Sequence, residues 1–235
     1  VVRKGETGTP EYIEKEAAAL GIKTIKVNLD GQFRLGGSRL YENWIEGILD
    51  INDKQEFILE TESNFEVKVV DSPIEMEKFL IAKNQEGFKA RMTAGYCWTW
   101  HDPNEDGTLP NDVKIGNWEK PWNVKGDRGV GGYMSGELWA IDPLGFDQIG
   151  CVYTVQGFEY DWNGVIIGPD LVWRSNKWVA VPEGSKDPAM RGLEPSQYER
   201  LIKNTYKVLF TRGLVGTLIY SVDPETQEYL RSLVS

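Results

Sequence analysis

Three short segments of this sequence combine polar side chains with residue types that end secondary-structure elements. They are Gln32-Phe33-Arg34, Gln156-Gly157-Phe158-Glu159 and Thr211-Arg212-Gly213. An arginine guanidinium is always charged and donates two parallel hydrogen bonds, which suits the oxygens of a phosphoryl group. A glycine permits close approach to the backbone, and a glutamate accepts hydrogen bonds. Together these types could contact a phosphorylated ligand and stabilise negative charge that develops on it.

Each arginine also has a simpler interpretation. Arg34 follows a strand pattern, where an arginine is ordinarily a surface salt-bridge partner. Arg212 ends a helix pattern, where a cation complements the helix dipole and Gly213 can cap the last turn. The residue types alone leave both interpretations open.

Hydrophobic periodicity and capping residues predict the elements that position these segments. Helices are predicted over 10–20, 38–49, 72–83, 196–212 and 223–233. Strands are predicted over 25–29, 65–69, 89–96, 138–141, 149–154, 164–168 and 217–221, with a hairpin over 171–181 that turns at Ser175-Asn176. Two helices open on a capping pair, Ser72 with Glu75 and Ser196 with Glu199. Because strands alternate with helices, we expect an α/β three-layer sandwich with a largely parallel sheet.

The second helix carries an apolar stripe that should face the core. Its members are Tyr41, Trp44, Ile45, Ile48 and Leu49. Their spacing of three and four residues places them on one face of a helix. This stripe predicts a helix packed against the sheet.

Residues 101–134 show no periodicity, and we expect an irregular insertion there. Trp98, Trp100, Trp118 and Trp122 lie in or beside it, and they could pack the insertion or stack on nucleic-acid bases. The run Asp102, Asn104, Asp106, Gly107 imitates the start of a calcium loop. Position twelve is Val113 rather than glutamate, so the sequence predicts no metal site. Asp142 at the end of an apolar run is expected to be a turn residue, because Pro143 follows it.

Composition excludes several classes of function. Lys and Arg number 26 against 36 Asp and Glu, a net charge of −10, which disfavours an electrostatic nucleic-acid binder. Two distant cysteines, Cys97 and Cys151, and one histidine, His101, exclude the common zinc spacings and histidine-based triads. No phosphate loop of the form GxxxxGK[ST] occurs. No apolar stretch could span a membrane and no signal peptide is evident, so a cytoplasmic protein without membrane contact is expected.

In their order along the chain, the three segments resemble the fourth, fifth and sixth motifs of superfamily 1 helicases. Those motifs belong to the second of two RecA-like domains. The stretches AGYCWTW, YTVQGFEYDWNGVIIGPD and NTYKVLFTRG resemble more closely a prokaryotic DNA/RNA helicase-like family of unknown function, grouped with Schlafen-type proteins. The resemblance extends through nearly all 235 residues.

The resemblance implies that residues 1–235 form a second RecA-like domain and that a separate N-terminal domain carries the phosphate loop. Arg34 and Arg212 would be arginine fingers, and Gln32, Gln156, Gly157 and Glu159 would contact ATP bound with Mg²⁺. Lys207 stands where the resemblance leads us to expect arginine, so a salt bridge or phosphate contact there would be weaker. Expected partners are the N-terminal domain and DNA or RNA, and this chain alone should be inactive. The alternative is a non-catalytic α/β domain that binds other proteins.

Overall fold

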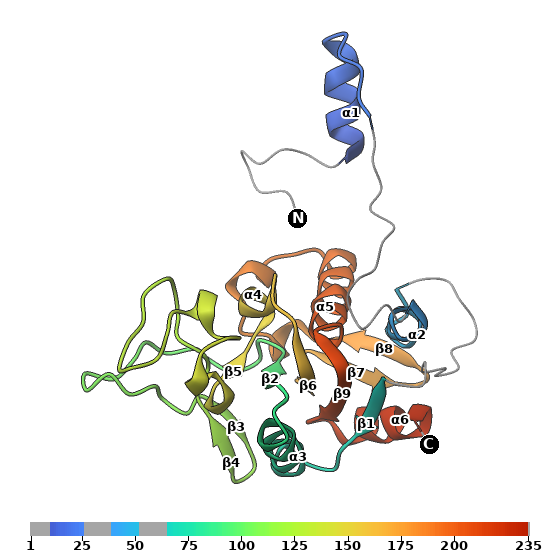
Figure 1. Cartoon of the computed structure of the whole chain (residues 1–235). Helices are drawn as coiled ribbons and strands as arrows, with labels where there is room; N and C mark the ends of the chain where they lie inside the picture. The colour runs from blue at the N-terminus through green and yellow to red at the C-terminus, as the bar shows by residue number, and fades with distance from the viewer. Residues whose placement is uncertain (1–9, 26–38, 52–64, 235) are drawn as a thin grey trace. The chain divides into compact units, whose positions relative to one another are not determined.

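The computed structural model of the chain describes residues 10–25, 39–51 and 65–234 (Figure 1). Contacts divide the chain into two units, Val1–Gly31 and Gln32–Ser235. In the first unit, helix α1 (Pro10–Ala19) begins at a proline, and Gly21 follows it with a φ of 68°. This helix was predicted, because proline suits the first helical position and glycine suits a left-handed residue after the last turn. Most of the strand predicted over 25–29 lies outside the described residues.

The second unit is built on a sheet of five parallel strands in the order β1-β9-β6-β2-β5. Their bounds are β1 (Glu66–Val69), β2 (Ala90–Ala94), β5 (Ile149–Gly150), β6 (Tyr160–Ile167) and β9 (Gly213–Ser221). Helices lie on both faces, so the fold is the α/β three-layer sandwich of RecA-like domains, as predicted (Figure 1). All strands are parallel, and their amino ends therefore share one edge of the sheet.

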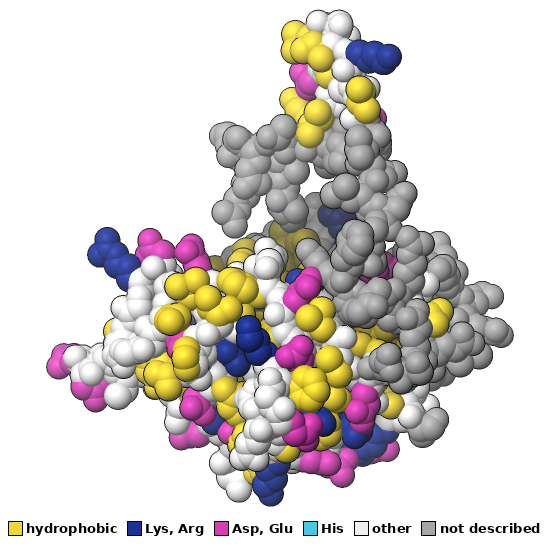
Figure 2. Space-filling model, in the orientation of Figure 1, with side chains coloured by type: hydrophobic (Ala, Val, Ile, Leu, Met, Phe, Trp, Pro, Cys, Tyr) yellow, Lys and Arg dark blue, Asp and Glu magenta, His cyan; other side chains and the backbone are white. Residues whose placement is uncertain are grey.

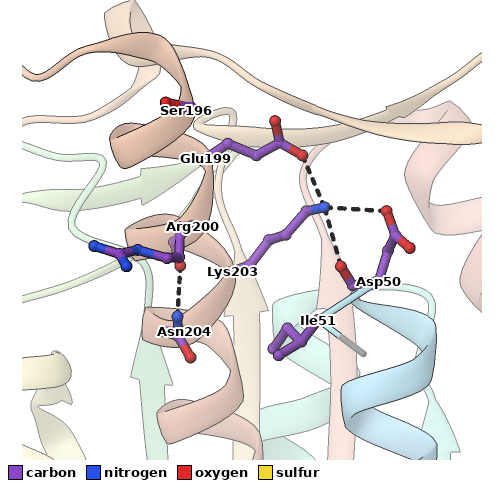
Figure 3. A pocket seen from close by; sticks show the side chains of 7 residues that line it. All are labelled: Asp50, Ile51, Ser196, Glu199, Arg200, Lys203 and Asn204. Carbon is purple, nitrogen blue, oxygen red and sulfur yellow. Dashed lines mark hydrogen bonds and ion pairs between the residues drawn. The ribbon is translucent and has the colours of Figure 1, made fainter. Parts of the chain in front are cut away.

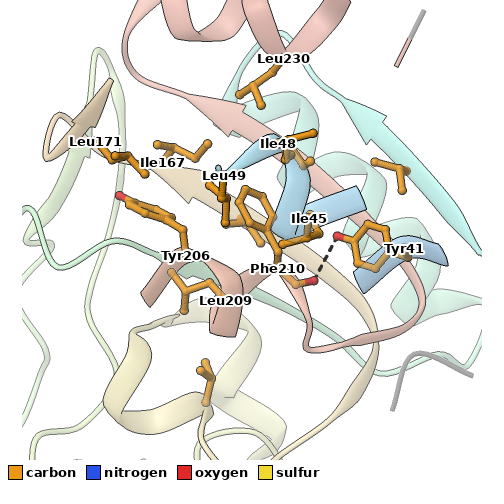
Figure 4. Packing of buried hydrophobic residues seen from close by; sticks show 14 of the residues in the cluster. Tyr41, Ile45, Ile48, Leu49, Ile167, Leu171, Tyr206, Leu209, Phe210 and Leu230 are labelled. Carbon is orange, nitrogen blue, oxygen red and sulfur yellow. Dashed lines mark hydrogen bonds between the residues drawn. The ribbon is translucent and has the colours of Figure 1, made fainter. Parts of the chain in front are cut away.

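One face of the sheet packs against three helices. These are α2 (Arg39–Ile48), α5 (Pro195–Phe210) and α6 (Pro224–Val234). Alternate strand residues such as Val165, Ile167 and Ile219 join the helical side chains in one buried cluster (Figure 4). The predicted stripe of α2 is fully buried there, and the Tyr41 hydroxyl donates to the Phe210 carbonyl of α5 at 3.2 Å.

The other face packs against α3 (Pro73–Gln85) and the insertion. The intervening strand residues, including Ile166 and Leu218, point to this side. The α3 helix starts as predicted, because the Ser72 hydroxyl accepts from the Glu75 amide at 3.1 Å. Alternation of the two clusters along β6 and β9 is what a sheet covered on both faces requires.

The described part of this unit also contains several short elements. They are β3 (Val113–Ile115), β4 (Trp118–Lys120), α4 (Val152–Val155), β7 (Leu171–Arg174), β8 (Lys177–Ala180) and the 3₁₀ turns Gly136–Leu138, Pro143–Asp147, Pro182–Gly184 and Pro188–Met190. The β7–β8 hairpin turns at Ser175 and Asn176 with φ of 50° and 61°, as predicted. The insertion is largely irregular, but it contains the β3–β4 hairpin, which no periodicity indicated.

Two strand predictions are wrong. Residues 138–141 form no strand, because the Leu138 carbonyl accepts from the amides of Ile141 and Asp142 and turns the chain. Asp142 instead caps the 3₁₀ turn that follows, as a turn residue should. The strand predicted over 149–154 ends at Gly150, where α4 begins.

The α5 helix also differs from its predicted ends. It starts after Glu194 without a side-chain cap, so Ser196 and Glu199 form no capping box. Its C-cap is Thr211, and Gly213 already belongs to β9. Position 213 requires glycine because of close packing and not because it caps the helix: a Cβ there would lie 2.5 Å from the Gly216 carbonyl oxygen.

Candidate functional site

The loop that contains Gln156, Gly157 and Glu159 joins α4 to the amino end of β6. Gly157 has a φ of 89°, a conformation that other residues adopt only with strain. No atom lies within 4 Å of where its Cβ would be, so the backbone angle, and not lack of space, requires glycine. Gln156, Gly157 and Glu159 are all exposed. The loop therefore presents its polar groups and one open stretch of backbone to solvent.

Arg212 lies between α5 and β9 and is only 4% exposed. Its Nε donates to the Val208 carbonyl at 2.9 Å, and its Nη2 donates to the Thr211 hydroxyl at 3.2 Å. Both acceptors belong to the end of α5, where the last carbonyls have no helical partner. The guanidinium thus stabilises a helix end, which is the simpler of the two roles that the sequence left open.

The sheet brings Arg212 beside the exposed loop. β6 and β9 are parallel neighbours, with Tyr160 opposite Gly213. The Tyr160 amide donates to the Arg212 carbonyl at 3.3 Å. Glu159 precedes Tyr160 and Arg212 precedes Gly213, so the two residues lie at the same amino edge of the sheet, although they are far apart in the sequence. Gln32 and Arg34 lie outside the described residues.

A buried polar network lies beneath this edge. The Tyr160 hydroxyl donates to the Asn163 side chain at 3.1 Å, and the Asn163 amide donates to the Leu209 carbonyl of α5 at 2.7 Å. Burial raises the pKa of Tyr160, and the charges of Arg212 and Arg91 oppose that shift. The network joins β6 to the end of the helix that carries Arg212.

Arg91 is a buried cation that the sequence analysis did not single out. It is 6% exposed, and its two terminal nitrogens donate to the carbonyls of Ala90 at 2.8 Å and Asp142 at 2.9 Å. Its Nε has no hydrogen-bond partner among the residues that the structure describes, and burial lowers the pKa of the side chain. The only sequence signal was one charged residue inside the apolar strand ARMTA, which would ordinarily be placed on an exposed face. Arg91 holds the turn at Asp142 against the amino half of β2.

A profile of Schlafen group 3 DNA/RNA helicase domains matches residues 1–223. The chain belongs to this family. The Schlafen group 3 chain is also 28% identical over 177 residues to the uncharacterized protein YPL245W of Saccharomyces cerevisiae. That match includes 71% of this chain but 37% of the yeast protein, so the chain spans well under half of the curated relative.

Lys207 of the Schlafen group 3 chain binds two carboxylates of α2. Its Nζ lies 3.1 Å from Glu42 Oε1 and also contacts Glu46. Burial lowers the pKa of Lys207, but the hydrogen bonds to Glu46 and Glu42 outweigh this and raise it. In this structure Lys207 holds α5 against α2, so its salt bridges are well formed.

Trp118 and Trp122 of this Schlafen group 3 domain are buried, at 6% and 1% exposure. Trp118 donates to Glu77 of α3 at 2.8 Å, and Trp122 packs against the rings of Tyr96 and Trp100. These two tryptophans hold the insertion against the sheet, which is the packing role and not the stacking role. Trp98 and Trp100 are half-buried.

Other candidate groups are used structurally. His101 Nδ1 lies 2.7 Å from Asp112 Oδ1 on the surface of the insertion. The Asp106 carboxylate of the calcium-like run accepts from the amide and hydroxyl of Thr108. Among the residues that the structure describes, no three His, Cys, Asp or Glu side chains gather in a metal-binding group. Within those same residues, no helix is long and apolar enough to cross a bilayer.

Two hollows open on the described surface, and neither is lined by the predicted site residues. One has a volume of about 230 Å³ and lies between the end of α2 and the outer face of α5 (Figure 3). Lys203 occupies its wall and binds Glu199 at 2.8 Å and the Asp50 carboxylate at 3.3 Å. The second, of about 500 Å³, lies between α4 and the insertion.

Proposed function

We propose that this chain is the second RecA-like half of a helicase-like ATPase. In this proposal Arg212 and Arg34 are arginine fingers, and Gln32, Gln156, Gly157 and Glu159 contact the nucleotide. ATP with Mg²⁺ would bind between this chain and a phosphate-loop domain of the same protein. DNA or RNA would be the polymer on which the assembled motor acts.

The observation that carries the proposal is the meeting of two motif segments at one edge of the sheet. The Gln156–Glu159 loop is exposed, and Arg212 is joined to it through the Tyr160 amide. Membership of a helicase-domain family supports the same reading. A cation beside exposed acceptors and open backbone fits a nucleotide, whose phosphates need positive charge and whose sugar needs hydrogen-bond acceptors.

In the proposed mechanism this chain contributes little covalent chemistry. Phosphoryl transfer spreads negative charge over the equatorial oxygens of the transferred group. A guanidinium placed there stabilises the transition state more than the ground state, and so raises turnover more than binding. The Asn163 network would keep the end of α5, and with it Arg212, in register with the loop.

The test is ATP hydrolysis by the full-length protein that includes a phosphate-loop domain. Arg212→Ala should lower turnover by about 10³-fold or more and leave ATP binding nearly unchanged. Arg212→Lys should restore little, because a point charge cannot replace the planar fork. Arg34→Ala should behave like Arg212→Ala.

Because Arg212 also stabilises the end of α5, a matched control is needed. Thr211→Val removes the hydroxyl that accepts from Arg212 and that donates to the Lys207 carbonyl at 2.9 Å. It weakens the same helix end but keeps the guanidinium, so it should lower Tm and leave turnover within a few-fold. Turnover within a few-fold in Arg212→Ala would refute the assignment.

A second candidate function is a non-catalytic α/β domain that binds other proteins. Its support is the burial of Arg212 and the use of its guanidinium by the helix end. In that case Arg212→Ala and Thr211→Val should lower stability alike, and any ATP hydrolysis by the full-length protein should respond equally to both.

A further inference from the structure

The 500 Å³ hollow between α4 and the insertion is lined by residues that are not part of the proposed nucleotide site. Its lining residues are Trp100, Val124, Lys125, Gly126, Asp127, Gly136, Glu137, Tyr153 and Thr154. It therefore combines two aromatic rings, one lysine and two carboxylates. Its chemistry is independent of whether the amino edge of the sheet binds ATP.

The two aromatic side chains are held in place by contacts outside the hollow. Trp100 packs edge-on against Tyr96, with ring centroids 5.7 Å apart, and its ring lies tilted against that of Trp122, with centroids 5.8 Å apart. The Tyr153 hydroxyl donates to the Asp187 carboxylate at 2.8 Å, yet the residue remains 49% exposed. Both rings are thus positioned before any ligand arrives, which lowers the entropy cost of binding.

The walls of the hollow are also well ordered. The Gly136 amide donates to the Gly126 carbonyl at 3.0 Å and joins the two loops. A Cβ at Gly136 would lie 2.4 Å from the Val124 carbonyl oxygen, so only glycine permits this approach. The Thr154 hydroxyl donates to the Asn123 side chain at 3.1 Å and accepts from the Cys151 amide at 3.0 Å. These polar groups satisfy one another.

The charged side chains that line the hollow give it a net negative charge. Lys125 is engaged, because its Nζ lies 3.3 Å from both the Trp100 carbonyl and Asp102 Oδ1. Asp127 and Glu137 make no hydrogen bond or ion pair with any residue in the described part of the chain. The hollow therefore offers two uncompensated carboxylates next to two aromatic rings.

This combination suits a cation and disfavours a phosphate. Aromatic faces attract a guanidinium or an ammonium group, and carboxylates pair with it. Two free carboxylates on a chain with a net charge of −10 repel nucleic acid. Figure 2 shows acidic side chains spread over the visible face of the described residues, with Lys and Arg scattered among them.

We propose that this hollow binds an arginine or lysine side chain from a basic peptide segment of a partner protein. Residues flanking that side chain would find apolar surface at Met134 and Leu138, which are both 42% exposed and lie within three residues of Glu137 in the chain. The cation would lie between the aromatic rings and the carboxylates of Asp127 and Glu137.

The test uses the 235-residue chain labelled with ¹⁵N and follows its indole N–H resonances by NMR. Trp100→Phe identifies the resonance of interest. The probe is an acetylated, amidated heptapeptide with one central arginine, and its twin carries citrulline, which has the same shape without charge. The arginine peptide should shift the Trp100 resonance, and the citrulline peptide should bind at least about fivefold more weakly.

Two variants separate the hollow from general surface attraction. Asp127→Asn with Glu137→Gln keeps the shape and should weaken the arginine peptide about tenfold. Glu105→Gln removes one exposed acid that does not line the hollow, and it should change affinity less than twofold.

Several results would overturn the proposal. They are no shift of the Trp100 resonance at about 10 mM peptide, equal binding of the citrulline twin, or unchanged binding by the double variant. A single-stranded oligothymidylate that competes with the peptide for the Trp100 resonance would show instead that the hollow is a nucleic-acid site.

Discussion

Asn163 should be a key stabilising residue of the edge that carries Arg212, and replacing it by leucine tests this. The side chain is fully buried in β6. It accepts from the Tyr160 hydroxyl at 3.1 Å and donates to the Leu209 carbonyl at 2.7 Å. That carbonyl lies in the last turn of α5, where no helical amide remains to donate to it. Asn163→Leu keeps the branched shape and the number of side-chain heavy atoms and removes both bonds.

The expected cost follows from the groups that lose a partner. A buried polar group left unpaired costs about 1–3 kcal/mol. The Leu209 carbonyl loses its partner and should cost this full amount. The Tyr160 hydroxyl also loses Asn163, but it still interacts with the Thr93 hydroxyl, so its cost should be smaller. We therefore expect a loss of about 2–4 kcal/mol in the free energy of unfolding, equivalent to about 4–16 °C in Tm.

Urea unfolding followed by tryptophan fluorescence measures this loss, and a double-mutant cycle with Tyr160→Phe checks its origin. Tyr160→Phe removes one bond and should cost about 1–2 kcal/mol. The double variant should cost less than the sum of the two, since both single changes break the same bond. An Asn163→Leu protein within about 0.5 kcal/mol of the parent, or strictly additive single effects, would refute the reasoning.

Three further predictions concern other parts of the chain. Cys97 and Cys151 should not react with a thiol reagent in the folded chain at pH 8, because both are buried. Burial raises the pKa of Cys151 to about 11 and that of Cys97 well above its ordinary value. Both should react in denaturant, and rapid labelling of the folded chain would contradict this prediction. Hydrogen bonding to Arg174 holds the pKa of Asp223 well below its usual range, so its stabilising effect is present above about pH 4 and lost as the pH falls. The Tm deficit of Asp223→Asn should therefore be largest near neutrality and shrink toward pH 2, whereas a constant deficit would show that the charge is not responsible. The 235-residue chain alone should not hydrolyse ATP and should bind it poorly, because it has no GxxxxGK[ST] loop, and turnover free of contaminating ATPase would exclude the half-site proposal.

Local patterns predicted the elements whose structure depends on near neighbours. The stripe of α2, the Ser72 cap of α3 and the turn at Ser175-Asn176 all follow from contacts within a few residues. The prediction failed at 138–141, where an apolar run resembled a strand. Trp139 there fills space beneath the sheet and donates to the Gly145 carbonyl at 2.9 Å, a contact that strand periodicity does not encode.

For the candidate site too, the sequence predicted some features and could not predict others. The residue types and their order selected Arg212 and the Gln156–Glu159 loop, because a guanidinium, a glycine and a glutamate have chemistry that is independent of the fold. The sequence could not show that Arg212 is buried against the end of α5, nor that Arg91 is buried in the same half of the sheet. Burial depends on which faces other elements cover.

The sequence by itself determined the five longer helices, most of the strands and the absence of a phosphate loop, because each depends on short stretches of chain. Only the tertiary structure decided that β6 and β9 are neighbours and that Glu159 and Arg212 share an edge. It also placed Trp100 and Tyr153 in one hollow with the carboxylates of Asp127 and Glu137. Strand order and hollows arise from contacts between distant residues, whose free energy is shared over the whole core and is not written in any one segment.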